Sequence, residues 1–192
     1  PSKQGLGDTH WGGLNELLEA PGNVDKSRIL DWLDNYLALN TYEISIPALK
    51  DPEMAPDGKT GLIVSILTEY DLFKFVADTG WYKEFISEME NRIIRVLANS
   101  VYPMLKEKVM ARFSFSPLSY ANRVGSSEGA ITGWSFQEAV PVIHKIQQAN
   151  RAVLTPIPSV YQAGQWTYSP AGVPMSILTG KLAANKILKA KK

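Results

Sequence analysis

Hydrophobic residues recur at helical spacing in two long stretches of the chain. Between Asp25 and Asn40 apolar side chains stand three and four residues apart, and Asp25 occupies the place of a helix N-cap. From Trp81 to Leu97 the same spacing runs without interruption through aromatic, methionine and aliphatic residues. The pattern predicts two amphipathic helices. A stripe like the second one is far more often core than a cofactor site.

Several shorter runs have the residue types or the alternation of β-strands. YEISIPAL (42–49) and GLIVSIL (61–67) are joined by a connection rich in Pro, Asp and Gly, which predicts an antiparallel pair with a long loop. In VMARFSF (109–115), apolar residues alternate with Met110, Arg112 and Ser114, which is typical of a half-buried strand. VYQA (160–163) is predicted as a short apolar strand. We therefore expect an α+β fold with an antiparallel or mixed sheet of about four strands under helices.

The remaining segments complete this outline. NRVGSSEGAITGW (122–134) carries three glycines and is predicted as a loop, whereas 140–152 is predicted to be helical. After the strand at 160–163, a Gly- and Pro-rich loop leads into an amphipathic helix that reaches Leu188. Pro174 stands near the first helical position, where its missing N–H costs nothing.

Composition limits the classes of function. The 192 residues are 45% hydrophobic and 20% charged, with a net charge of +1 and no basic stripe, so no nucleic-acid partner is expected. The absence of cysteine, of a membrane-length apolar run and of a signal-peptide core favours a cytoplasmic protein. The lysines at 186–192 are attributed to a helix C-terminus, and peripheral membrane contact is the less favoured interpretation.

No arrangement of side chains suited to catalysis is present in the sequence. Neither His10 nor His144 lies in a metal-binding spacing, and no metal is expected. The carboxylate pairs on the predicted helices are attributed to solvated helix faces rather than to an acid–base dyad. Without a nucleophile–base arrangement, hydrolysis or acyl transfer is not expected from this chain alone. Any chemistry is therefore expected to come from a cofactor.

Three stretches in order carry a more specific signal: YEISIPALKDPEMAPDGKTGLIVSIL, SPLSYANRVGSSEGAITGW and VYQAGQWTYSPAGVPMSILTGKLAA. Together they span residues from about 42 to 188. They resemble a strand–loop–strand, a later glycine-containing loop and the C-terminal flavin-binding segment of the phytoene desaturase, carotenoid isomerase and retinol saturase flavoproteins.

The resemblance implies a division of the chain and a cofactor. Residues 1–155 would be part of a substrate-binding domain, and 156–192 would be the C-terminal segment of an FAD-binding domain. The family's N-terminal dinucleotide fingerprint is not found in this sequence, so we expect the C-terminal portion of a larger flavoprotein. In the related proteins an Asp often stands at the position of Gln165 and binds a ribityl hydroxyl, a bond that an amide can also make. The residues implied in FAD binding are Ala163, Gly164, Gln165, Gly172, Val173, Pro174 and Ser176.

The implied activity is oxidation, reduction or isomerisation of double bonds in an apolar polyene or isoprenoid. The sequence does not choose among desaturation, saturation and isomerisation, and it names no catalytic side chain. Phe113, Phe115, Ile131 and Trp134 are expected to line the substrate site, although ordinary core packing explains them equally well. The alternative function is a non-enzymatic module that binds an apolar ligand or a protein partner.

The resemblance also implies how the isolated chain behaves. It is expected to be inactive and not to retain FAD, because no glycine-rich loop holds the pyrophosphate. Its expected partners are the missing N-terminal half and a second copy that covers residues 159–190, where the terminal strand and helix would be exposed.

Overall fold

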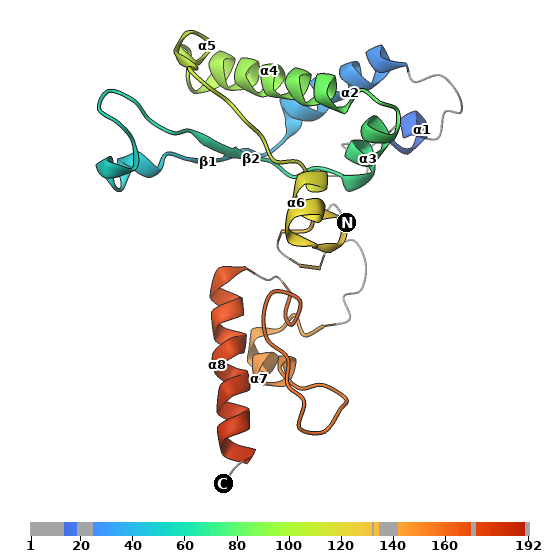
Figure 1. Ribbon diagram of the computed structural model, residues 1–192, viewed down its shortest axis with the longest axis vertical. Coiled ribbons are helices and arrows are strands. Elements are labelled where there is room, and N and C mark those ends of the chain that lie inside the picture. The colour runs from blue at the N-terminus through green and yellow to red at the C-terminus, as the bar shows by residue number, and fades with distance from the viewer. Residues whose placement is uncertain (1–13, 19–24, 132, 135–141, 170–171, 191–192) are drawn as a thin grey trace. The chain divides into compact units, whose positions relative to one another are not determined.

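The chain divides into two compact units, Ser2–Leu118 and Ser119–Lys192. The computed structural model describes residues 14–18, 25–131, 133–134, 142–169 and 172–190 (Figure 1). Helices dominate both units and a small antiparallel sheet accompanies them, so the α+β fold is confirmed. The predicted domain boundary at residue 155 separates the substrate-binding part from the FAD-binding part of the chain. That division stays a prediction.

The first unit is built on five helices of the described chain. The longer of the two that open it, α2 (Lys26–Leu39), begins at Asp25, whose carboxylate accepts hydrogen bonds from the amides of Ser27 (3.1 Å) and Arg28 (3.3 Å). These bonds satisfy amides that a helix start leaves without partners, so the predicted N-cap and helix are confirmed. The others are α1 (Leu14–Leu18), α3 (Tyr70–Asp78), α4 (Tyr82–Ser100) and α5 (Leu105–Lys108).

Phe85 of α4 lies at the centre of the hydrophobic core. Its side chain is fully buried, and its ring meets those of Phe73 and Trp81 edge-on, with centroids 5.6 and 5.4 Å apart. Leu33 and Leu37 of α2 are also fully buried in this cluster. Edge-to-face aromatic pairs add to the stabilisation that burial gives. The prediction that the apolar stripe of the second helix is core is confirmed.

Ion pairs join α2 to α4 beside this core. The largely buried Arg92 pairs with Asp34 of α2 (Nε to Oδ1, 3.1 Å) and with Glu88 one turn earlier on α4. Arg95 pairs with the same Asp34 carboxylate. Removing Asp34 would leave the charge of Arg92 with less compensation in a mostly buried place. The Asp34 carboxylate therefore joins α2 to α4, whereas the pair of Glu88 with Arg92 lies within α4.

The predicted antiparallel pair is present but short. Strands β1 (Glu43–Ser45) and β2 (Ile63–Ser65) place Ile44 opposite Val64. Pro47 follows β1 closely and cannot donate to a sheet ladder, so the connection turns into two 3₁₀ helices, η1 (Pro47–Leu49) and η2 (Pro52–Met54). Within the described residues the sheet has these two strands, so the expected four-stranded sheet is wrong.

The segment 109–115 is not the half-buried strand that its alternation predicts. Its polar side chains contact α4: the Arg112 guanidinium bonds to Asn91 (2.6 Å) and Glu90 (3.0 Å), and the Ser114 hydroxyl donates to Glu90 (2.8 Å). The apolar side chain of Phe113 is 82% exposed. The polar face of the segment therefore contacts α4, all of its residues stay exposed, and no described strand pairs with it.

The second unit packs short elements against one long helix. Helix α8 (Val173–Ala190) and the single turn α7 (Ala149–Ala152) enclose a small cluster of Ala149, Ala152 and Tyr168, with Met175 and Leu182 packed on it. The unit also holds η3 (Ser127–Gly129) and η4 (Ile146–Gln148), and α6 (Pro117–Val124) crosses the boundary from the first unit.

Three expectations for this unit need correction. The run 160–163 forms no strand: Tyr161 makes one isolated antiparallel bridge to Leu154. The stretch 140–152 is helical only from Ile146, because Ile143 is bridged to Tyr168 instead; residues 140–141 lie outside the described residues. The loop at 122–134 begins later than expected, since α6 extends to Val124, and residue 132 lies outside the described residues.

Among the described helices, none has the length and apolar character needed to cross a lipid bilayer. The described residues also contain no group of three or more His, Cys, Asp or Glu side chains that is placed to hold a metal ion.

Two phenylalanines test this description of the core. Phe85→Ala should lower the free energy of unfolding by ~3–5 kcal/mol, because it opens a cavity among fully buried rings. Phe113→Ala should change it by no more than ~0.5 kcal/mol, because that ring is exposed. Urea unfolding of both variants measures the difference. A cost for Phe113→Ala close to that for Phe85→Ala would show that the Phe113 face is buried.

A buried tyrosine, Tyr36, and a half-buried one, Tyr42, make the first unit sensitive to alkali. Burial raises the pKa of Tyr42 to about 12 and raises that of Tyr36 further; the Tyr42 hydroxyl donates to the Leu37 carbonyl (2.7 Å). An unfolded tyrosine titrates near 10, so their contribution to stability is complete below about pH 10 and is lost as the pH rises through the folded values.

The stability difference between wild type and Tyr42→Phe should therefore shift in favour of the variant between about pH 9 and pH 11.5. Urea midpoints at both pH values measure it. An unchanged difference would show that Tyr42 has its ordinary pKa.

Candidate functional site

The predicted cofactor residues lie on a loop that ends at the start of α8. Gly164 has φ +105° and Gly172 has φ +148°, backbone conformations that residues with a Cβ rarely adopt. A Cβ added at Gly164 would meet nothing within 4 Å. Glycine is therefore favoured at Gly164 by the backbone itself, and the space beside it is open.

A threonine that the sequence analysis did not single out holds this loop to the helix. The amide of Gly164 donates to the hydroxyl oxygen of Thr179 (3.1 Å), and that hydroxyl lies within hydrogen-bond distance of the Met175 carbonyl (2.8 Å). Thr179 is fully buried. A threonine within the apolar face of a helix often bonds back to the carbonyl four residues earlier. The position of Thr179 on that face was the feature of the sequence that could have indicated this contact.

The N-terminus of α8 exposes main-chain donors. The first amide bonded within the helix is that of Ser176, which donates to the Gly172 carbonyl (2.9 Å). The amides of Val173 and Met175 belong to the first turn of α8. The amides of a first turn have no acceptor within their own helix. Pro174 is the second residue of α8, close to its predicted place, and has no N–H to satisfy. The positive end of the helix dipole therefore lies at this loop.

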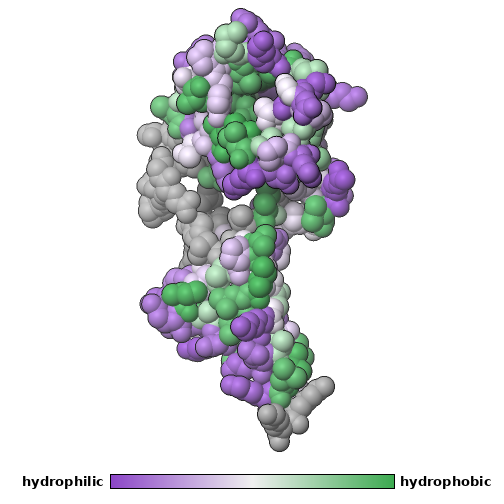
Figure 2. All heavy atoms as spheres, turned by 90° about the vertical axis from the view of Figure 1, so that its left-hand side faces the viewer, coloured by the Kyte–Doolittle hydropathy of each residue, from purple (hydrophilic) through white to green (hydrophobic). Residues whose placement is uncertain are grey.

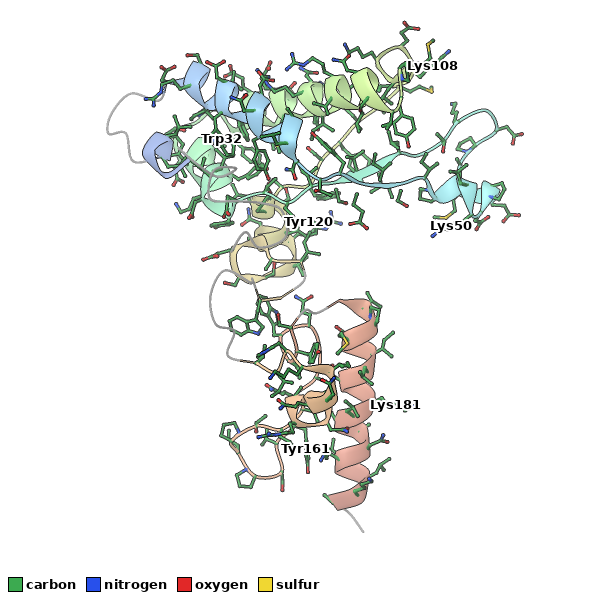
Figure 3. The ribbon with its side chains drawn as sticks, turned by 180° about the vertical axis from the view of Figure 1, so that it is seen from behind. Trp32, Lys50, Lys108, Tyr120, Tyr161 and Lys181 are labelled. Carbon is green, nitrogen blue, oxygen red and sulfur yellow. The ribbon has the colours of Figure 1, made fainter. Side chains whose placement is uncertain are left out.

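The charges of α8 agree with this polarity. The helix contains no acidic residue; Lys181 lies at its middle, and Lys186 and Lys189 lie in its second half. Figure 3 shows Lys181 on the side of α8 that faces away from α7, and Tyr161 in the loop on the other side of α7. An anionic group is therefore stabilised best at the N-terminal end of α8.

Two of the predicted substrate residues, Ile131 and Trp134, lie against the loop that carries the predicted cofactor residues. The indole N–H of Trp134 donates to the Trp166 carbonyl (3.0 Å), and the two rings meet edge-on with centroids 5.4 Å apart. The Gln165 amide, oriented as its neighbours require, donates to the Ile131 carbonyl (2.9 Å) and accepts from the Trp166 indole N–H (3.3 Å). Ile131 and Trp134 thus form one aromatic and amide cluster with Gln165 and Trp166, which are distant from them in sequence.

The other two predicted substrate residues lie elsewhere. Phe113 and Phe115 belong to the first compact unit, where their rings contact each other edge-on at 5.9 Å and are exposed. Their role in lining a substrate site stays a prediction.

One buried polar group near the loop lacks a partner. The Ser169 side chain is 1% exposed, and its hydroxyl finds no hydrogen-bond partner among the described residues. Its amide donates to the Ile143 carbonyl (3.0 Å), which fixes the chain three residues before Gly172. A buried hydroxyl without a partner is costly and is available to a ligand.

The exposed side of α8 is also apolar. Val173, Ile177, Ile187 and Leu188 are exposed, and of these Ile177 and Leu188 lie, with Lys181, on the side opposite the buried Thr179 and Ala183. Figure 2, in which α8 faces the viewer, shows hydrophobic residues along the helix. A helix that is apolar on two sides usually contacts a neighbour on each.

Comparison with curated proteins gives a distant similarity to one kind of enzyme. The chain is similar to the 4,4'-diapophytoene desaturases (4,4'-diaponeurosporene-forming) of Staphylococcus aureus strains Newman, USA300 and COL, with 26% identity over 148 residues. The match covers 76% of this chain but 28% of each desaturase, so the chain corresponds to less than a third of their length. No protein-family profile matches the chain, and no solved structure matches it. The family resemblance is thereby supported at the level of a distant relationship.

The tether between α8 and the loop can be tested with two substitutions of Thr179. Thr179→Val keeps the shape but leaves the Gly164 amide without its acceptor, so it should cost ~1–3 kcal/mol of stability. The Gly164 amide should also exchange its hydrogen much faster. Thr179→Ser keeps the hydroxyl and should retain the slow exchange. Thermal unfolding and amide exchange by NMR measure both effects, and slow exchange in Thr179→Val would exclude the tether.

Proposed function

We propose that this chain supplies the C-terminal, cofactor-contacting part of an FAD-dependent oxidoreductase that acts on an apolar polyene or isoprenoid. The observation that carries the proposal is the loop from Gly164 to α8, where two glycines with positive φ stand before a helix N-terminus. The distant similarity to diapophytoene desaturases supports the same class of reaction. Their name favours desaturation over saturation or isomerisation for this chain.

The residues of the loop fit the edge of a flavin. The helix start at Val173 and Pro174 offers main-chain donors and a positive dipole end, which suit a ring edge that gains negative charge on reduction. Gly164 leaves open space beside the backbone, and Ser169 adds a buried hydroxyl that has no partner among the described residues. When bound, FAD supplies the exchange of hydride with the substrate. The chain itself binds and orients the cofactor and excludes water.

The apolar residues beside the loop suit a hydrocarbon substrate. Ile131 is 60% exposed, and Trp166 and Trp134 present an edge-to-face aromatic pair next to Gln165. A polyene offers no hydrogen-bonding groups, so its recognition depends on such apolar walls. We propose that this cluster forms one wall of the substrate site, close to the cofactor.

A second function has its own observation. The exposed apolar side of α8 and the exposed ring of Phe113 are surfaces that a partner-binding module would use. The two functions differ in cofactor content: the enzyme carries flavin, whereas the module does not.

The experiment uses the complete gene product that contains these residues. It should purify with the visible absorbance of a bound flavin and should convert a polyene or isoprenoid presented in lipid vesicles. Gly172→Leu should expel the flavin, because its side chain would project at the helix start. Gly172→Ala imposes the same backbone strain with little bulk, so it should retain much more flavin.

Gly180→Ala controls for effects on the helix. Gly180 lies inside α8 with nothing within 4 Å of an added Cβ, so alanine should stabilise by ~0.5–1 kcal/mol and leave flavin content unchanged. The flavin-to-protein ratio and melting temperature distinguish the variants. A wild-type protein without flavin would contradict the proposed function, and equal flavin loss in both Gly172 variants would contradict the placement of this loop.

A further inference from the structure

We infer that Gln165 is a positioning residue that clasps the wall formed by Ile131 and Trp134 to the loop with the predicted cofactor residues, rather than a ligand of the cofactor. The inference rests on the proposed function for its consequence in catalysis, but its geometry is a property of this chain alone. Nothing in the sequence suggests this contact, because the two segments are more than thirty residues apart.

The amide of Gln165 is used at both ends. Its nitrogen donates to the Ile131 carbonyl (2.9 Å), and its oxygen accepts from the Trp166 indole N–H (3.3 Å). These partners fix the orientation of the amide, since a carbonyl can only accept and an indole N–H can only donate. The side chain is therefore directed toward residue 131 and not toward the open space beside Gly164.

A second tie reinforces the first. The Trp134 indole N–H donates to the Trp166 carbonyl, and the two rings pack edge-on. On the other side, the Gly164 amide is bound to Thr179 of α8. The aromatic wall is thus linked through residues 164–166 to the helix whose N-terminus would face the cofactor. Gln165 determines how far this wall lies from that helix start.

The clasp requires a donor at position 165, and a carboxylate cannot replace it. In Gln165→Glu the side chain keeps its length and can still accept from Trp166, but its oxygen would face the lone pairs of the Ile131 carbonyl. A ligand of a ribityl hydroxyl needs only an acceptor, which glutamate keeps. The two roles therefore give opposite results for this one substitution.

The first experiment measures the clasp in the 192-residue chain without flavin. The near-UV circular dichroism of the Trp134–Trp166 pair reports their packing, and Trp134→Phe identifies that part of the spectrum. Gln165→Glu should lose most of the pair signal at neutral pH while far-UV dichroism stays unchanged. On protonation near pH 4 the acid regains a donor, so the signal should return, whereas the wild-type signal should stay constant.

Two results would overturn the clasp. One is a Gln165→Glu spectrum at neutral pH that equals the wild-type spectrum. The other is a loss that does not recover on acidification in a chain whose far-UV spectrum shows that it is still folded. Gln165→Met, which has similar length and no polar group, should lose the signal at both pH values.

The second experiment uses the complete protein and separates the clasp from the proposed function. Gln165→Glu should keep the wild-type flavin content and raise the KM for the polyene several-fold, because the wall is displaced and the cofactor is not. Loss of flavin in Gln165→Glu with an intact tryptophan signal would make Gln165 a cofactor ligand and overturn the inference. A wild-type protein without flavin would contradict the proposed function, while the tryptophan spectrum would still decide the clasp.

Discussion

The second unit depends on a single buried hydroxyl, that of Thr179. Its oxygen accepts from the Gly164 amide and lies 2.8 Å from the Met175 carbonyl, so one side chain connects the loop to two turns of α8. The ends of the loop at Gly164 and Gly172 are then fixed against the same helix. A polar group with no exposed surface is stable there because its bonds are made within the chain. Of the predicted cofactor residues, Gly164 and Ser176 contact the Thr179 hydroxyl directly.

Local signals predicted the three longest described helices, α2, α4 and α8. The spacing of apolar residues located α2 and α4, Asp25 marked the start of α2, and Pro174 marked the start of α8. Each of these signals is contained in the element itself, because a helix makes its hydrogen bonds within one segment. A strand is stabilised by hydrogen bonds to a second strand elsewhere in the chain. Its own sequence therefore indicates that it can pair, but not whether a partner strand is present. The runs 109–115 and 160–163 both have strand-like sequences and remain outside any described sheet.

The segment 109–115, which contacts α4 through its polar face and is exposed throughout, shows why alternation alone was insufficient. Alternation predicts that one face is buried, and the usual assumption is that the apolar face is the buried one. Here Glu90 and Asn91 of α4 attract Arg112 and Ser114, and the phenylalanines point outward. The identity of the neighbouring surface decided the orientation, and that surface is set by the fold of α4 against α2.

For the candidate site, the sequence located the loop and its glycines but not the contacts that shape it. Gly164 was among the residues implied in FAD binding; the structure adds that its φ of +105° itself favours glycine. The contact of Gln165 with Ile131 joins segments that are distant in sequence, so no local pattern encodes it. Thr179 lacked any signal beyond a hydroxyl on an apolar helix face.

Two sides of helix α8 carry apolar residues, and they contribute differently to the position of the helix start. The side that carries Thr179 and Ala183 is buried within the unit and fixes the helix start against the loop. The side that carries Ile177 and Leu188 is exposed and contributes nothing to that placement within this chain. The orientation of the N-terminal amides is therefore already determined before any partner covers the exposed side. A partner on that side would add stability to α8, but the direction in which its dipole points is set by Thr179 and the packing around it.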